Sequence, residues 1–365
     1  MIRKFTKPIA LILICITVLP LCASCGGQNQ TVLSYDGIEI DQTAYEYWYI
    51  QLKDYYVDSY ADIVDEIPFW NSTMPETDAT YAEYIDTKIR TQIEYYLAGN
   101  ILFDHYNLKL SETVINSIDT DIDDGINAFG SRAEYDAYLE SRYNVNSREL
   151  RKIKLMEQKF LAVYNYLYDP TTGIEKATDT EIADFYTNNY VRIKYYMVLK
   201  NYDYIYDNNG NRVVENNAYK TVELDEAGKL ENKQHAQDVF EAVKNGENID
   251  EYIKKYFGDL ATKFPNGYYV LNNDTYVAAF TSTIIGPAFE LEINEVTLCE
   301  NEDAYFVVQR FGLIDNAYLG SDKSQFDSIS SDAVEKKFIE KFEGIMETIE
   351  RNTELVNNYS VTTVR

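Results

Sequence analysis

The side chains that most often perform catalysis or bind metal ions are rare in this sequence. Its 365 residues include only two histidines, His105 and His235. His105 ends a long predicted helix, where a cation interacts favourably with the helix dipole, and His235 lies in a second predicted helix as a solvated side chain. Two histidines cannot build a multi-histidine metal site, and they leave few candidates for a Ser-His-Asp or Cys-His centre. Neither kind of site is therefore expected.

Carboxylates, in contrast, are so abundant that their pairing means little. With 60 Asp and Glu residues, pairs suited to glycoside hydrolysis arise by chance. One run, residues 119–125, is similar to a calcium-binding loop. Its glycine, Gly125, comes one place late, however, and the twelfth position is Gly130 instead of Glu. The run predicts a solvated acidic helix face, and neither a metal nor another cofactor is expected.

The N-terminal residues determine the expected compartment. Residues 1–24 have basic residues followed by an apolar run that is shorter than the ~20 residues of a spanning helix, which is typical of a signal peptide. Ala23 and Ser24 directly before Cys25 resemble the bacterial lipobox, although Cys22 stands where Leu is usual. The resemblance implies a diacylglycerol on Cys25 and a tether over 25–31, which place the protein on the extracytoplasmic face of a bacterial cell membrane. The alternative is an ordinary cleaved signal peptide.

Cleavage would also change the charge and the thiol count. It removes three basic and no acidic residues, which takes the formal charge from −27 to −30. Nucleic acid is not an expected partner, because binding it depends on basic side chains that neutralise phosphates. With Cys25 acylated, Cys299 is the only free thiol, so no intramolecular disulfide can form. Cys299 is expected to be a buried apolar residue and not a nucleophile.

Helical periodicity dominates residues 32–190. Helices must therefore position any site in this half of the chain. A hairpin turns at Asp36-Gly37, and Asp41 caps the next helix. Apolar residues repeat every four positions from Ile85 to Ile101, which predicts a long helix with one buried stripe. Further helices are expected over 111–128 and 131–141. Two more begin at capping boxes: one at Asn146 with Glu149, and one at Thr178 with Glu181, which ends near Asn189.

The pattern changes at Val191 and changes back near residue 330. The middle region combines strands with helices. In order we expect a strand over 191–200, a hairpin turn at 208–210, helices over 233–244 and 249–257, a strand near 267–270, a helical patch over 276–291 and a strand over 304–310. After a loop over 314–329, Asp332 and Glu335 are expected to cap a last helix, and residues 359–364 alternate like an edge strand. The predicted fold class is α+β.

This order resembles the extracytoplasmic foldases of the PrsA/SurA type, in which a parvulin domain interrupts a helical chaperone domain. Loose matches in the family's order carry the resemblance: 36–41 with Tyr45, 129–131 with 148–150, 192–198, 249–256, 286–296 and 304–308. It implies a helical SurA-N-like chaperone domain over 32–190 and a parvulin-like α+β domain over 191–313. A C-terminal helix and tail over 314–365 would return to the helical domain.

The resemblance also assigns a candidate proline pocket. The family carries one histidine on the first parvulin strand and one on the last, and Tyr195 and Phe306 stand at these positions here. Asp259 falls near a position that holds Cys or Asp in the family, and Tyr276 and Phe280 fall near apolar pocket residues. Prolyl isomerisation needs an apolar pocket that twists the amide, and no nucleophile or metal. Because both histidines are replaced, weak or absent isomerase activity is expected; an active isomerase that tolerates Tyr195 is the alternative.

Tyrosine is the most unusual feature of the composition, with 34 residues. Clusters such as Tyr45, Tyr47 and Tyr49 place aromatic rings all around one helix. One helix face cannot bury them all, and tyrosine offers apolar area with a polar tip. We therefore expect a groove lined by tyrosine between helical parts; a compositional bias of the organism is the alternative.

These features together predict a membrane-anchored extracytoplasmic chaperone or foldase. Its expected partners are unfolded or newly exported polypeptides, with the membrane contacted through the lipid anchor alone. The alternative from another class is a solute- or polymer-binding surface lipoprotein without a folding role.

Overall fold

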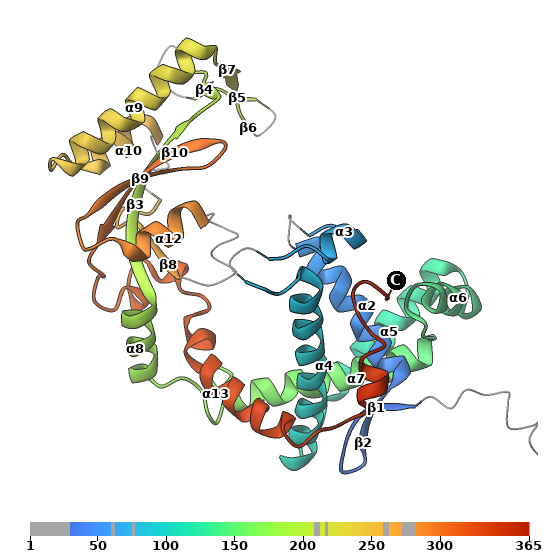
Figure 1. Ribbon diagram of the computed structural model, residues 1–365. Helices are drawn as coiled ribbons and strands as arrows, with labels where there is room; N and C mark the ends of the chain where they lie inside the picture. The colour runs from blue at the N-terminus through green and yellow to red at the C-terminus, as the bar shows by residue number, and fades with distance from the viewer. Residues whose placement is uncertain are drawn as a thin grey trace, which may run out of the picture. The chain divides into compact units, whose positions relative to one another are not determined.

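The computed structural model describes residues 30–59, 63–74, 77–207, 212–215, 218–257, 263–271 and 282–364 (Figure 1). The chain forms two compact units. Unit 1 comprises Met1–Ile174 and Lys336–Arg365, and unit 2 comprises Glu175–Glu335. Unit 2 is thus inserted into the sequence of unit 1, and each unit has a core of its own.

Unit 1 is built mainly of helices. They are α2 (Gln42–Ser59), α3 (Ile67–Trp70), α4 (Tyr81–His105), α5 (Glu112–Phe129), α6 (Arg132–Tyr143) and α7 (Ser147–Tyr168). The apolar stripe from Ile85 to Ile101 is buried, as predicted. The predicted Asn146–Glu149 capping box begins α7. Except for the single-turn α3, where the sequence predicts a loop, these helices form where they are predicted, because their caps and periodicity are local signals.

A three-stranded antiparallel sheet adjoins these helices. Its order is β11 (Glu350–Arg351), β1 (Thr31–Tyr35) and β2 (Ile38–Asp41). Asp36 and Gly37 form the predicted turn between β1 and β2, both with positive φ (45° and 83°), as a tight hairpin requires. The Ala44 N–H then donates to Asp41 Oδ1 over 2.9 Å at the start of α2, which confirms Asp41 as the cap.

The C-terminal segment completes unit 1. Helix α13 (Ile329–Met346) begins three residues before the predicted cap Asp332, and α14 (Thr353–Val356) follows β11. Within unit 1, Phe342 of α13 is fully buried and packs against Tyr95 and Phe160, with ring centroids 5.8 Å from each. The core of unit 1 therefore includes side chains from both of the sequence segments that form it.

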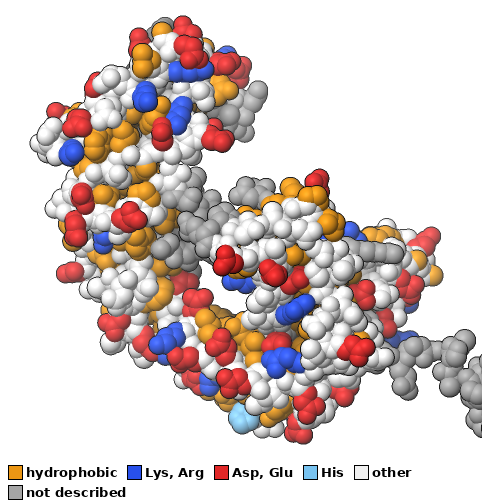
Figure 2. Space-filling model, in the orientation of Figure 1, with side chains coloured by type: hydrophobic (Ala, Val, Ile, Leu, Met, Phe, Trp, Pro, Cys, Tyr) orange, Lys and Arg blue, Asp and Glu red, His pale blue; other side chains and the backbone are white. Residues whose placement is uncertain are grey.

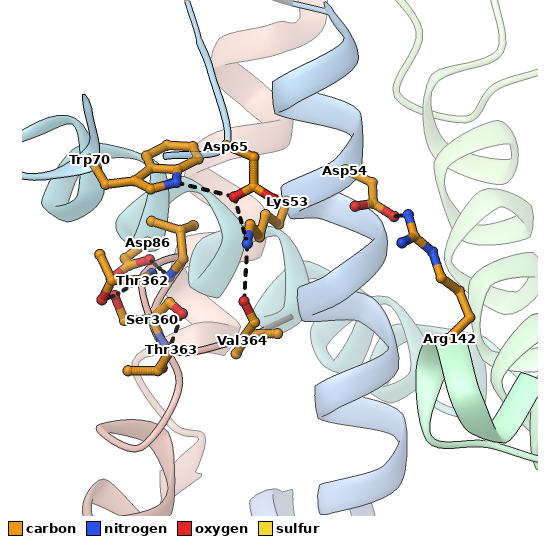
Figure 3. A network of polar contacts seen from close by, with 11 residues as sticks. Lys53, Asp54, Asp65, Trp70, Asp86, Arg142, Ser360, Thr362, Thr363 and Val364 are labelled. Carbon is orange, nitrogen blue, oxygen red and sulfur yellow. Dashed lines mark hydrogen bonds and ion pairs between the residues drawn. The ribbon is translucent and has the colours of Figure 1, made fainter. Parts of the chain in front are cut away.

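The strand predicted over 359–364 is wrong. These residues form turns, and they are held by buried polar groups of the helices. The Val361 N–H donates to Asp86 Oδ1 over 2.8 Å, and the Val364 carbonyl accepts a bond from Lys53 Nζ over 3.0 Å (Figure 3). Lys53 also pairs with Asp65 at 2.9 Å. The alternation of buried residues reflects anchoring to α2 and α4 instead of pairing with a strand.

Unit 2 is an α+β unit around a four-stranded antiparallel sheet, and the predicted fold class is confirmed. The sheet order is β8 (Tyr268–Leu271), β3 (Tyr190–Leu199), β10 (Ala304–Phe311) and β9 (Val296–Glu300). The helices are α8 (Asp179–Asn189), α9 (Glu226–Lys244), α10 (Ile249–Phe257) and α12 (Ser282–Glu290), with short 3-10 turns η2 (Ala317–Leu319) and η3 (Lys323–Gln325). Small two-stranded pairs join β4 (Tyr202–Tyr204) to β7 (Thr221–Glu223) and β5 (Val214–Glu215) to β6 (Ala218–Tyr219).

Both faces of the unit 2 sheet are buried. Side chains alternate between the two faces along each strand, and helices cover each face. Ile193 and Phe306 pack with Ile284 and Ala288 of α12 on one face. Residues of α9 and α10 cover the other face, where they pack against Tyr196, Val198 and Val307. Helix α9 begins seven residues before the predicted start, at the cap Asp225, and β9 lacks a predicted counterpart. The predicted turn at 208–210 lies outside the described residues.

Within the described ranges, no helix combines the length and the apolar character needed to cross a bilayer.

Candidate functional site

A groove of about 420 Å³ lies in unit 1 among α2, α5, α6 and α7. We call it the tyrosine groove, because four tyrosines line it: Tyr47, Tyr135, Tyr138 and Tyr143. Aliphatic residues complete its apolar lining: Val114, Ile118, Ile122, Leu139 and Leu150. The expected groove lined by tyrosine is thus present in the helical part of the chain.

Local sequence signals fix the helices that form the groove. Ser111 caps α5, and Ser131 caps α6 by accepting a bond from the Glu134 N–H over 3.2 Å. Gly130 between these two helices has a left-handed φ of 88°, which glycine adopts without steric cost. Asn144 ends α6 in the same conformation. The chain therefore reverses direction at two defined points and folds α5, α6 and α7 against each other.

Ion pairs fix how these helices face each other. The guanidinium group of Arg151 on α7 binds the Asp119 carboxylate of α5 through two nitrogens, and Arg142 of α6 binds Asp54 of α2 over 2.7 Å. A bidentate arginine–carboxylate pair fixes orientation as well as distance. The run 119–125 is helical, as predicted, and Asp119 is the member of the run that this pair uses.

Aromatic contacts extend the groove into a continuous surface. The Tyr47 and Tyr143 rings meet edge to face with centroids 5.6 Å apart. Phe129, at the end of α5, contacts Tyr138 at 4.6 Å and Tyr135 at 5.5 Å. Phe129 and Tyr138 are 41% and 40% exposed, so part of each residue is accessible to a ligand.

The polar groups of the groove are neutral donors, one compensated cation and one carboxylate, Asp121. Burial raises the pKa of Tyr47 to about 12, so its phenol stays protonated. Burial alone would lower the pKa of Lys154, but Glu157 and Tyr47 outweigh this effect and raise it. The Lys154 ammonium lies 2.9 Å from Glu157, which also accepts a bond from the Trp48 indole over 2.9 Å. The charge of Lys154 is therefore balanced within the protein.

Most tyrosines of the predicted clusters lie elsewhere. Tyr45 and Tyr49 are buried in the core beside α4, and Tyr47 alone of that cluster lines the groove. Sequence reasoning missed Tyr135, Tyr138 and Tyr143 as groove residues. A signal for them exists, because Tyr135, Tyr138, Leu139 and Tyr143 follow the i, i+3, i+4, i+8 spacing of one helix face.

The structure describes two of the five candidate proline-pocket residues. Tyr195 and Phe306 lie on the face of the unit 2 sheet that α12 covers, with ring centroids 6.3 Å apart. Burial raises the pKa of Tyr195 to about 12, with a further contribution from the nearby Tyr268. Asp259, Tyr276 and Phe280 lie outside the described residues, as does the predicted lipid anchor Cys25. The pocket and the anchor therefore stay predictions.

Two other candidate residues of unit 2 have defined surroundings. Cys299 is half-buried against Phe306, and burial raises its pKa to about 11, which disfavours the nucleophilic thiolate. His235 was predicted to be solvated, and this is wrong. It is half-buried and forms a 3.0 Å hydrogen bond with the Tyr196 hydroxyl, because its face of α9 packs on the sheet. In the described part of the chain, no three His, Cys, Asp or Glu residues are placed to hold a metal ion.

Comparisons with known proteins find similarity to solved structures. No family model and no curated protein matches the chain. A structure of PrsA from Bacillus subtilis is 16% identical, with a TM-score of 0.24, over 76% of this chain and 93% of that one. The foldase protein PrsA from Streptococcus pneumoniae is 12% identical, with a TM-score of 0.26, over 82% and 98%. Both of these solved structures are of proteins named PrsA.

Proposed function

We propose that this protein is a membrane-anchored extracytoplasmic chaperone that holds unfolded, newly exported polypeptides in the tyrosine groove. The observation that carries the proposal is the groove itself, in which four tyrosines and five aliphatic side chains form one open apolar surface. Unfolded segments expose apolar side chains without a fixed shape. Tyrosine suits them because each ring gives apolar area and a polar tip at low entropic cost.

The groove also offers hydrogen bonds to a bound backbone. Gln51, Ser117 and Gln158 line it together with the tyrosine hydroxyls. An extended peptide needs such partners, because a desolvated N–H or C=O without one costs about 1–3 kcal/mol. Side-chain amides and hydroxyls can turn to meet different peptides, which favours a broad range of clients over a single one.

Unit 2 is proposed to act as a binding module with weak or absent prolyl isomerase activity. Tyr195 replaces one expected histidine, and its raised pKa keeps the phenol neutral. Phe306, which replaces the other, is buried in the sheet's core and has no hydrogen-bonding group. An isomerisation assay with a proline peptide on residues 26–365 checks this part, and a rate equal to that of an active parvulin would contradict it.

The chaperone proposal is tested by truncating a ring at the open side of the groove. We expect Tyr138→Ala to weaken the suppression of aggregation of a denatured client severalfold, because it removes an exposed aromatic face. The matched control is Tyr55→Ala, which truncates a tyrosine that is 58% exposed on α2 and does not line the groove. Equal loss in both variants would contradict the assignment of the groove. Failure of the unaltered protein to suppress aggregation, with tight binding of one small molecule, would favour a solute-binding lipoprotein.

A further inference from the structure

We propose that the tyrosine groove selects cationic clients, that is, polypeptide segments in which Lys or Arg residues alternate with apolar ones. The inference rests on the proposed function and adds the chemistry of the segment that binds. It follows from two observations: which charged groups of the groove are already paired within the protein, and which of its tyrosine rings already have a cation of the protein over them.

The groove has an unbalanced negative charge. Its lining contains one cation, Lys154, and one carboxylate, Asp121. Lys154 is paired with Glu157 at 2.9 Å. Asp121, in contrast, is exposed and has no ion pair or hydrogen bond to a side chain within the described ranges. Its neighbour Asp119 binds Arg151 of α7, whereas Asp121 remains as the charge that a ligand meets.

The tyrosine rings of the groove also fall into two groups, those with a cation of the protein over them and those without one. Two of the four tyrosines already have a cation of this chain over their rings: Lys154 lies 5.5 Å from the Tyr47 centroid, and the Arg142 guanidinium lies 5.7 Å from that of Tyr143. Tyr135 and Tyr138 contact the Phe129 ring, but no Lys or Arg of the described chain lies over either of them. An aromatic face next to a carboxylate attracts an ammonium or guanidinium group more strongly than either group alone.

Tyr135 and Asp121 are neighbours on the wall of the groove. A Cβ added to Gly125 would come within 2.6 Å of the Tyr135 ring, so this ring lies directly against α5. Asp121 is four residues, or about one turn, before Gly125 on that helix. A cation over Tyr135 would therefore be within reach of the Asp121 carboxylate, while an apolar neighbour in the client contacts the aliphatic lining.

The charge of the whole chain acts in the same direction. The sequence carries −27, and Figure 2 shows acidic side chains over both units on the face in view. A net negative protein raises the association rate of cationic segments and lowers that of acidic ones, and salt screens both effects. Selection within the groove must therefore be separated experimentally from this general attraction.

The experiment compares three fluorescent peptides on residues 26–365 by anisotropy: repeated Phe-Arg-Leu-Ala, Phe-Gln-Leu-Ala and Phe-Glu-Leu-Ala units. We expect affinity to fall in that order. Asp121→Asn should reduce the preference for the arginine over the glutamine peptide about two- to fivefold, as for an exposed charge pair. The control is Asp123→Asn, which changes net charge equally but lies two residues away, on the opposite face of α5.

The outcomes separate this inference from the proposed function. Equal binding of all three peptides overturns the selection of cationic clients and leaves the chaperone groove intact. An arginine preference that both variants retain also overturns it, because general attraction then explains the preference. Binding of no peptide contradicts the proposed function as well.

Discussion

His235 illustrates how one half-buried residue gives the fold a pH dependence. Burial lowers its pKa below the ordinary 6.5, with a further contribution from Lys255. Tyr196 bonds to the ring, Tyr256 packs on it, and Asp238 and Asp203 act in the opposite direction. Below pH 6.5 the unfolded chain therefore binds a proton that the folded chain resists, so the free energy of unfolding falls as the pH falls.

We expect His235→Gln to lose this part of the pH dependence. In the unaltered protein, the urea midpoint should be highest above pH 6.5 and decrease as the pH passes below it; the variant should decrease less. The control is His105→Gln at the end of α4, which is in unit 1 and distant in sequence from this contact. A parallel pH dependence of the unaltered protein and His235→Gln would contradict the assignment.

Asp86 stabilises unit 1, because one of its buried carboxylate oxygens binds two segments that are far apart in the sequence. Asp86 Oδ1 accepts bonds from the Tyr49 hydroxyl over 2.6 Å and from the Val361 N–H over 2.8 Å. We expect Asp86→Ala to destabilise the protein by about 2–4 kcal/mol, because it leaves two buried donors without a partner. Tyr49→Phe removes only one of the two bonds and should cost less. Urea denaturation checks this order, and an equal cost for the two variants would refute it.

At the scale of elements, Gly99 determines how closely α4 and α7 can pack. A Cβ at this position would lie 2.7 Å from the Phe160 ring and 2.9 Å from its Cα. Because backbone is involved, rotating the Phe160 side chain cannot relieve the contact. Gly344 of α13 is the matched control, since a Cβ there meets nothing within 4 Å.

We expect Gly99→Ala to destabilise unit 1 although alanine favours helices. Overpacking costs about 1–3 kcal/mol, and the gain in helix propensity is about 1 kcal/mol. Gly344→Ala has the gain alone, so the two variants should differ by the overpacking cost, about 1–3 kcal/mol in the free energy of unfolding. If both variants stabilise the protein equally, the close approach of the helices does not limit stability.

The elements also show which parts of the fold were accessible from sequence. The capping boxes at Asn146 and Thr178 were predicted because their bonds join residues three apart. The tail over 359–364 alternates like a strand, but alternation alone does not reveal that Asp86 and Lys53, far away in sequence, hold it. His235 was misjudged for a similar reason, since its helix packs on a strand that comes earlier in the chain.

The tyrosine groove was predictable only in part. Tyr135, Tyr138 and Tyr143 share a face of α6 that the sequence spacing reveals. Tyr47 joins them from α2, and only the packing of α2 against α6 brings the two helices together. The composition thus predicts a groove lined by tyrosine, but tertiary contacts determine which tyrosines line it.

At the scale of the whole molecule, the chain order makes unit 1 depend on its C-terminal segment. Phe338 and Phe342 of α13 contact a ring of aromatic residues in unit 1: Tyr95, Phe160, Tyr164 and Tyr168. Unit 2 interrupts the sequence between these two parts but has core clusters of its own. Removing unit 2 should therefore be less harmful to unit 1 than removing residues 336–365.

This expectation can be tested by excising unit 2 while keeping both parts of unit 1. The Tyr168 hydroxyl donates to the Lys337 carbonyl over 3.4 Å, so the cut ends lie close and a short Gly-Ser linker can join residue 174 to residue 336. We expect this protein to unfold cooperatively in urea and to suppress client aggregation, because the tyrosine groove lies within unit 1. Residues 26–174 alone should show no cooperative transition, since the aromatic core then lacks Phe338 and Phe342. A cooperative transition of that fragment at the midpoint of the joined protein would show that the C-terminal segment is dispensable for the helical fold.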